Sequence, residues 1–159
     1  MCLITKQSAL AIADNPITAF KVVALNFEIK KGTDNSSYFT PFTKTKLTCC
    51  ENGTIKPLVA NGKLTKRKNG NYFEIYGNII HSYKNAYDAF LVANQLRKYN
   101  KNTFFFVYEC QIPKKTPFYE GKSQTKNGLK AFASKQLIFV KRLQNPYTPK
   151  PKQTELEFC

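Results

Sequence analysis

The sequence predicts an α+β fold, with a mixed or mainly antiparallel sheet of five or six strands and one main helix packed on one face. Short runs of β-branched and aromatic residues recur along the chain. A single segment carries apolar residues at helical spacing, and Asn-Gly turn signals separate several of the other runs. The 159 residues, 42% of them hydrophobic, fit one domain with its own core.

The first part of the chain is predicted to form short strands. Residues 18–25 follow Pro16, and a proline at that place does not remove a hydrogen bond from the sheet. Residues 38–42 contain Pro41, so they fit an edge strand or an extended loop. Residues 43–50 are a further short strand candidate.

A β-hairpin is predicted around Asn69-Gly70. This dipeptide favours a type I′ turn, which needs positive φ angles at both central residues. Residues 63–68 and 71–76 flank it and form the two expected strands.

The one predicted helix covers residues 86–99. Asn85 can cap its first turn, and Asp88 lies three residues further on in a pattern similar to a capping box. Asn100 or Asn102 can take the left-handed conformation that commonly ends a helix.

The strongest strand signal follows the helix at residues 103–112, where apolar side chains on both faces indicate a central strand. We predict a long polar loop at residues 114–127 and a last strand at 137–140. Residues 144–159 are rich in Pro and Lys and are expected to form an extended or disordered tail. The remaining residues, 1–143, then form the single basic domain.

A net charge of +15 favours anionic partners, nucleic acid above all. Only Arg67, Arg97 and Arg142 are arginines among the 25 basic residues. Arginine is the preferred residue for reading bases and clamping phosphates. An alternative therefore stays open, in which A/T-rich codons raised the lysine content without selection for binding.

Two stretches interleave basic and aromatic residues, as single-stranded nucleic acid requires. The leading hypothesis is a basic accessory protein that binds nucleic acid or another polyanion without catalysis. The alternative for each stretch is a solvated lysine face above core aromatics, because no known nucleic-acid-binding motif is present. The candidate binding residues are Lys63, Lys66, Arg67, Lys68, Tyr72, Lys114, Lys115, Lys122 and Lys126.

Two residues could support catalysis instead. His81 is the only histidine and therefore the natural acid–base candidate. Cys2 becomes the first residue if the initiator methionine is removed, and its α-amino group could then act as a base toward its own thiol. For each residue a structural role is the competing interpretation.

The sequence predicts neither a metal nor an organic cofactor. The five cysteines have no zinc-binding spacing, and no Gly-rich phosphate loop occurs. No signal peptide and no apolar run long enough to span a membrane is found. We therefore expect a cytoplasmic protein. The tail at 144–159 is available to a protein partner, so a protein-interaction module or an inhibitor of a host factor is a further alternative function.

Several segments together resemble a family of small uncharacterised proteins of gut bacteria and their phages. The resemblance spans most of residues 1–143, and it implies no activity. If the protein is phage-encoded, as the resemblance implies, its location would be the cytoplasm of an infected host cell or a virion. The family usually has Gly before the histidine and Lys-Gly after the proline, where this chain has Asn78-Ile79-Ile80 and Lys114-Lys115. The segments that carry the resemblance are Met1-Cys2-Leu3-Ile4, residues 17–23, Phe39-Thr40-Pro41-Phe42, His81-Ser82-Tyr83, Cys110-Gln111-Ile112-Pro113, Tyr119-Glu120-Gly121 and Ala133-Ser134.

The order of elements is also similar to that of ADP-ribosyltransferase-like folds, in which a strand ending in Ile-Pro follows the helix. The His-Gly or Arg-Gly motif and the Ser-x-Ser element of those folds are missing here. By position, the similarity implies Lys21, Tyr38 or His81, and Glu109 or Glu120 as site residues. The alternative function is therefore a small enzyme that combines His81 with Cys2 or with a glutamate such as Glu120.

Overall fold

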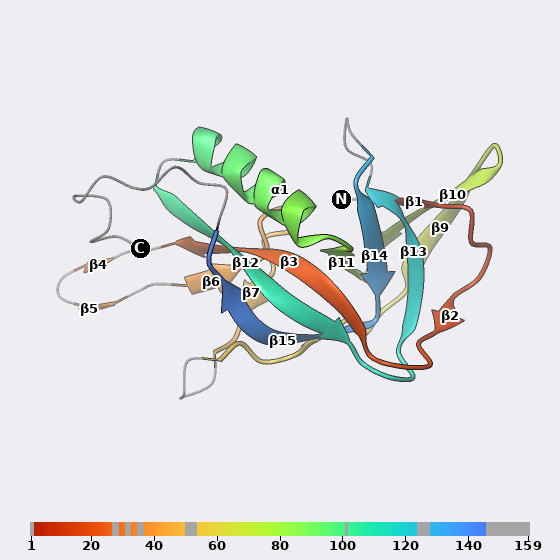
Figure 1. Ribbon diagram of the computed structural model, residues 1–159, viewed down its shortest axis with the longest axis horizontal. Helices are drawn as coiled ribbons and strands as arrows, with labels where there is room; N and C mark the ends of the chain where they lie inside the picture. The colour runs from red at the N-terminus through yellow and green to blue at the C-terminus, as the bar shows by residue number, and fades with distance from the viewer. Residues whose placement is uncertain are drawn as a thin grey trace.

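The structure is a computed structural model, which describes residues 2–26, 29–30, 33–34, 37–49, 54–100, 102–123 and 128–145. Figure 1 shows a strongly twisted sheet with helix α1 (Ala86–Tyr99) lying along one side of it. The strands are β1 (Leu3–Thr5), β2 (Ala11–Ile12), β3 (Ile17–Asn26), β4 (Ile29–Lys30), β5 (Thr33–Asp34), β6 (Ser37–Phe39), β7 (Lys46–Leu47), β8 (Leu58–Val59), β9 (Leu64–Asn69), β10 (Tyr72–Gly77), β11 (Ile80–Tyr83), β12 (Thr103–Ile112), β13 (Pro117–Ser123), β14 (Lys130–Ser134) and β15 (Gln136–Leu143).

Thirteen strands form one sheet, and all its pairings among the described residues are antiparallel. Its order is β8-β15-β12-β3-β11-β14-β13-β1-β10-β9, with β2 paired to β13, and with β6 paired to both β3 and β7. Strands β4 and β5 form a separate two-stranded sheet.

The predicted α+β fold with five or six strands is wrong, because the structure is mostly sheet and its main sheet has 13 strands. Many of the additional strands are only two to five residues long, as in β1, β2, β7 and β8. Such strands carry too few residues for a periodic pattern, and their partners across the sheet decide their conformation.

The long strand predicted at the centre of the sheet is confirmed. β12 pairs with β3 over ten residue positions, from Thr103 opposite Asn26 to Ile112 opposite Ile17. Its other edge pairs with β15, where the register shifts between Glu109 and Cys110. Apolar side chains on both faces of β12 are therefore covered, as a central strand requires.

Helix α1 begins and ends where the sequence predicts, but both predicted caps are wrong. The side chain of Asn85 makes no capping hydrogen bond, and its Nδ2 lies 3.4 Å from Asp88 Oδ2. Asn100 has a φ of −133°, outside the left-handed region. Its side-chain amide instead donates to the Leu96 carbonyl at 2.9 Å, which satisfies one of the free carbonyls at the end of the helix.

The predicted hairpin is confirmed, but its turn is displaced by one residue. Asn69, the last residue of β9, pairs with Tyr72, the first residue of β10, so Gly70 and Asn71 form the turn. Gly70 has a φ of +61°, whereas Asn71 is not among the residues with positive φ. A positive φ at the first central residue alone is the pattern of a type II′ turn, not of the type I′ turn predicted.

The predicted polar loop at 114–127 is wrong over most of its described part, because residues 117–123 form β13. Pro117 begins this strand, where its missing N–H costs no hydrogen bond of the sheet. Gly121 lies under the β1 backbone, and a Cβ added there would be 2.1 Å from the Ile4 carbonyl oxygen. Pro117 therefore marks the start of β13, and Gly121 allows the backbones of β13 and β1 to come close together.

The apolar side chains form two clusters, one on each face of the sheet. The first packs α1 against β3 and β12, through residues such as Ala89, Phe90, Val22 and Phe105. The second lies on the opposite face and includes Leu47 and Ile55 from the segment after β6, as well as Val23, Cys110, Leu137 and Phe139. In the described residues, no helix is long and apolar enough to cross a membrane.

Candidate nucleic-acid interface

A row of side chains crosses five neighbouring strands on the face of the sheet that points away from α1. The register places Lys130 opposite Lys122, Lys122 opposite Ile4, Ile4 opposite Glu74, and Glu74 opposite Arg67. We call these five residues the cross-strand row. With strands about 4.8 Å apart, the row spans roughly 19 Å.

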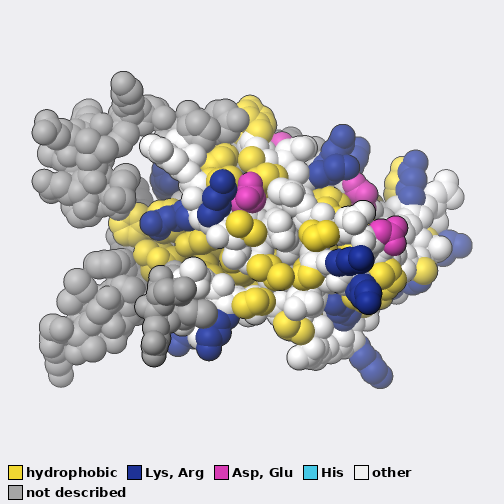
Figure 2. Space-filling view, turned by 60° about the horizontal axis from the view of Figure 1, so that its bottom comes forward, with side chains coloured by type: hydrophobic (Ala, Val, Ile, Leu, Met, Phe, Trp, Pro, Cys, Tyr) yellow, Lys and Arg dark blue, Asp and Glu magenta, His cyan; other side chains and the backbone are white. Residues whose placement is uncertain are grey.

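The cross-strand row is exposed and mainly cationic. Lys130, Lys122 and Arg67 are exposed, while Ile4 and Glu74 are half-buried. Glu74 is the one anion in the row, and its Oε1 accepts a hydrogen bond of 3.0 Å from Asn69 Nδ2. Figure 2 shows that Lys and Arg side chains gather at the end of the molecule that carries β1, β9, β10, β13 and β14.

Two exposed tyrosines and another lysine adjoin the row. Tyr72 and Tyr76 lie on β10, each two residues from Glu74. Their side chains therefore point to the same face of the sheet as that of Glu74. The Lys6 ammonium lies 5.6 Å from the centre of the Tyr72 ring, in a cation–π contact. The face therefore combines cations that attract phosphates with flat rings on which bases can stack.

Lys84 and Glu120 form an ion pair beside the row, with Nζ and Oε1 2.7 Å apart. The two side chains are 46% and 47% exposed, so solvent weakens the interaction and it contributes little to stability. The pair neutralises Lys84 in the free protein, so Lys84 is not counted among the free cations of this face.

The basic residues predicted around the hairpin lie on both faces of the sheet, not on one. Arg67 shares the row with Tyr72, but Lys66 and Lys68 point to the opposite face, since they are opposite Ile75 and Phe73. Lys66 is engaged there: its Nζ donates to the Ser8 carbonyl and lies 5.1 Å from the centre of the Phe73 ring. Lys63 is exposed just before β9.

The second predicted cluster is also divided. Lys122 lies in the row, whereas Lys114 and Lys115 are exposed in the turn between β12 and β13. Lys126 lies outside the described residues. Lys130 belongs to the second predicted stretch, whereas two contributors to this face, Lys6 and Ile4, lie in neither stretch. Only the pairing register brings them together, and no local pattern indicates that register.

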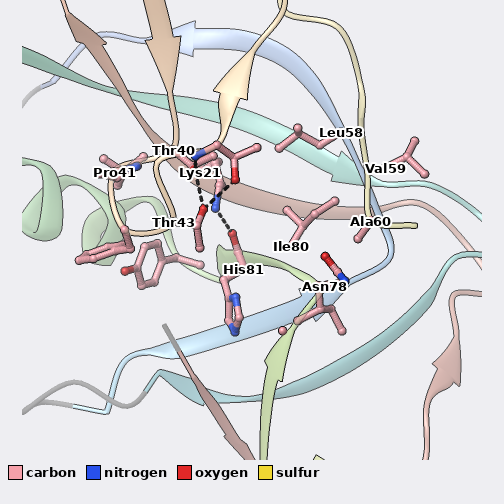
Figure 3. Close-up of a pocket in the computed structure, with 16 residues that line it drawn as sticks. Lys21, Thr40, Pro41, Thr43, Leu58, Val59, Ala60, Asn78, Ile80 and His81 are labelled. Carbon is pink, nitrogen blue, oxygen red and sulfur yellow. Dashed lines mark hydrogen bonds between the residues drawn. The ribbon is translucent and has the colours of Figure 1, made fainter. Parts of the chain in front are cut away.

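His81 is buried in β11, with only 5% of its surface exposed. Burial, with the positive charge of Lys21 as a smaller cause, lowers the pKa of its imidazole to about 3. Its Nε2 atom has no hydrogen-bond partner in the described part of the chain. The ring points away from Lys21 in Figure 3, and at neutral pH it carries no imidazolium proton to donate.

Glu120 and His81 lie on opposite faces of the sheet. Ala133 is directly opposite His81, and Tyr119 is directly opposite Ala133. Glu120 follows Tyr119 on the same strand, so its side chain points to the other face, where it meets Lys84. The structure therefore does not bring these two catalytic candidates together.

Cys2 is half-buried next to β10. Its thiol donates to the Leu3 carbonyl at 3.7 Å. Burial and the nearby Glu74 carboxylate raise the pKa of this thiol above its ordinary value, which lowers the fraction of reactive thiolate. Glu109, which the ADP-ribosyltransferase similarity implied, is opposite Phe20, so it faces away from Lys21.

Among the three cysteines in the described part of the chain, we predict that iodoacetamide modifies Cys49 first, Cys2 more slowly and Cys110 slowest. Cys49 is exposed and Cys110 is buried, with burial raising the pKa of the Cys110 thiol to about 12. Alkylation of Cys110 needs local opening and should be on the order of a hundredfold slower than that of Cys49. Peptide mass spectrometry over time measures each site. Faster reaction at Cys2 than at Cys49 would indicate an activated terminal nucleophile.

No family model, curated protein or solved structure matches this chain. The resemblance to small proteins of gut bacteria and their phages therefore stays a prediction. No group of three or more potential metal ligands occurs among the described residues.

Proposed function

We propose that this protein binds single-stranded nucleic acid, or a polyanion of similar charge spacing, on the exposed face formed by β9, β10, β1, β13 and β14. The cross-strand row beside Tyr72 is the observation that carries the proposal. A positively charged sheet surface with exposed aromatic rings combines backbone attraction with base stacking.

Three features of the face support this proposal over a lysine content that reflects codon usage alone. Lys122 and Lys130 stand directly opposite each other, although like charges in such positions weaken a sheet. Neither makes a salt bridge among the described residues, so both remain available to an anion. The aromatic ring of Tyr72 is exposed in the same surface, where a core residue would be covered.

The affinity for a labelled dT12 oligonucleotide should fall by roughly fiftyfold between 50 and 200 mM salt. This estimate assumes four phosphate contacts, from Lys6, Arg67, Lys122 and Lys130, and a single-strand salt slope of about −0.7 per contact. In the double variant Lys122→Gln/Lys130→Gln, two contacts remain and the fall should be only about sevenfold. Fluorescence anisotropy measures both.

The matched control is Lys114→Gln/Lys115→Gln, which removes the same charge from an exposed turn outside the row. It should retain the salt dependence of the parent protein. Tyr72→Ala should weaken oligonucleotide binding by roughly tenfold through loss of stacking. Tyr99→Ala removes a tyrosine that is 80% exposed at the end of α1, and it should have little effect. Equal losses of affinity in both double variants would contradict the proposal. Equal displacement of the oligonucleotide by heparin would favour the other polyanion over nucleic acid as the ligand.

A further inference from the structure

A cavity of about 270 Å³ lies on the face of the sheet opposite α1, between β3, β11 and the segments 40–45 and 58–60. Its walls are mainly apolar and include Leu58, Val59 and Ile80. Figure 3 shows Lys21 and Thr43 with Pro41 toward one end of this cavity, and Leu58, Val59 and Ile80 toward the other. The volume is near the lower end for small-molecule sites, so it suits a small ligand.

The sheet splits at this cavity, and the split explains the position of Lys21. One edge of β3 pairs with β12 along its whole length, while the other edge meets β11 only where Phe20 is opposite Tyr83. The His81 carbonyl therefore accepts its hydrogen bond from Lys21 Nζ, at 2.6 Å, in place of a strand N–H. Figure 3 shows this contact.

The Lys21 ammonium keeps unused hydrogen-bonding capacity. A lysine has three N–H donors, and the His81 carbonyl is the one acceptor found for Lys21 within the described residues. No Asp or Glu is among the described residues that line the cavity. Lys21 is half-buried, and a partly desolvated cation with no counter-anion among these residues favours an anionic ligand.

Three threonine hydroxyls lie at the same end of the cavity. Thr40 Oγ1 is 2.6 Å from Thr43 Oγ1, which is 3.0 Å from Thr45 Oγ1. Each of these two contacts uses one hydroxyl proton, so together they use two of the three. A third hydrogen bond, to Thr40 Oγ1, is donated by the Thr45 backbone N–H and uses no hydroxyl proton. One of the three hydroxyl donors is thus not used by these contacts.

We propose that this cavity binds a small aliphatic carboxylic acid as its carboxylate. The carboxylate accepts hydrogen bonds from the Lys21 ammonium and a threonine hydroxyl. The aliphatic chain packs against Leu58, Val59 and Ile80. A carboxylate fits better than inorganic phosphate because most of the wall is apolar.

Lys21 is the group expected to govern the pH dependence of binding. Burial lowers its pKa to about 8. Its titratable neighbours are Tyr108, directly opposite it on β12, Cys110 on the same strand, and His81 and Tyr83 on β11. Tyr38 on β6 lies near Tyr108. Burial raises the pKa of both Cys110 and Tyr83 to about 12 and lowers that of His81 to about 3. Burial also raises the pKa of Tyr108.

Hexanoate and the uncharged hexanamide provide matched probes, followed by ¹H–¹⁵N NMR titration of the full chain. At pH 7, hexanoate should bind at least roughly tenfold more tightly than hexanamide, since a hydrogen bond to a charged group contributes about 1.5–3 kcal/mol. Its affinity should fall about tenfold per pH unit above pH 8, as Lys21 loses its proton. Equal binding of the two probes, or hexanoate binding that is constant from pH 7 to 10, would overturn the proposal.

Lys21→Met keeps the apolar stem and should reduce hexanoate binding to the level of hexanamide, with hexanamide unchanged. Lys46→Met, an exposed lysine on β7 that does not line the cavity, is the control and should bind hexanoate normally. If Lys21→Met fails to fold, the pH series and the hexanamide comparison on the parent protein still decide the question. Chemical-shift changes with phosphate but not hexanoate would also overturn the proposal.

Discussion

Replacing Gly121 with alanine should lower the free energy of unfolding by on the order of 3 kcal/mol or more. The new Cβ would lie 2.1 Å from the Ile4 carbonyl oxygen and 2.9 Å from its carbonyl carbon. β1 cannot easily move away, because it pairs with β10 on one side and β13 on the other. Thr5 adds a further restraint, since its hydroxyl donates to the Glu120 carbonyl at 2.6 Å. Urea unfolding followed by circular dichroism measures the loss.

Gly62→Ala is the matched control for this prediction. A Cβ at Gly62 would lie 2.3 Å from Asn78 Nδ2, which is an overlap similar to that at Gly121. The Asn78 Nδ2 atom, however, is at the end of an exposed side chain that can rotate away. Its effect should stay within about 1 kcal/mol. An unchanged urea midpoint for Gly121→Ala would mean that β1 and β13 are not in close backbone contact.

The elements predicted correctly from the sequence are those with a strong local pattern. The helix repeats apolar residues at helical spacing, and the residues of β12 are apolar on both faces. The hairpin of β9 and β10 is marked by Gly70, which takes the positive φ that its turn needs, although the turn is displaced by one residue. In each of these segments the conformation agrees with the preference of its own residues.

The strands that were missed depend on partners far away in the chain. In β13, Pro117 and Gly121 both favour a loop when considered locally, yet β1 and β14 on its two sides hold this segment in the sheet. In β14, Ala131 and Ala133 have low strand preference but are fully buried beneath larger neighbours. No local pattern contains this information.

The candidate sites differ in how far the sequence could indicate them. Lys122 and Arg67 could be identified as basic residues, but their alignment with Lys130 depends on the register of five strands. Lys21 had a usable signal, because a lysine among Phe20, Val22 and Val23 in a predicted strand must be placed against core residues or a cavity. Lys21 was nevertheless predicted as a site residue only through the similarity to ADP-ribosyltransferase-like folds.

His81 should make the protein markedly less stable in mild acid. Its pKa is lowered to about 3 in the folded protein by burial and by Lys21, whereas an unfolded histidine has a pKa near 6.5. Between these values the unfolded chain binds a proton that the folded protein does not, so stability falls as the pH falls. From pH 7 to pH 5 the free energy of unfolding should fall by about 2 kcal/mol, and it should continue to fall until about pH 3.

Because His81 is the only histidine, its pKa can be measured directly as well as through stability. In the folded protein, the imidazole Cε1–H resonance should not shift between pH 8 and 5, while the urea-unfolded chain should titrate near pH 6.5. His81→Leu replaces the ring with an apolar side chain, so unfolding should become nearly independent of pH between 7 and 5. A folded-state titration between pH 6 and 7 would contradict the burial argument. It would also return His81 to consideration as an acid–base catalyst, because a group with a pKa near neutrality can accept and release protons during turnover.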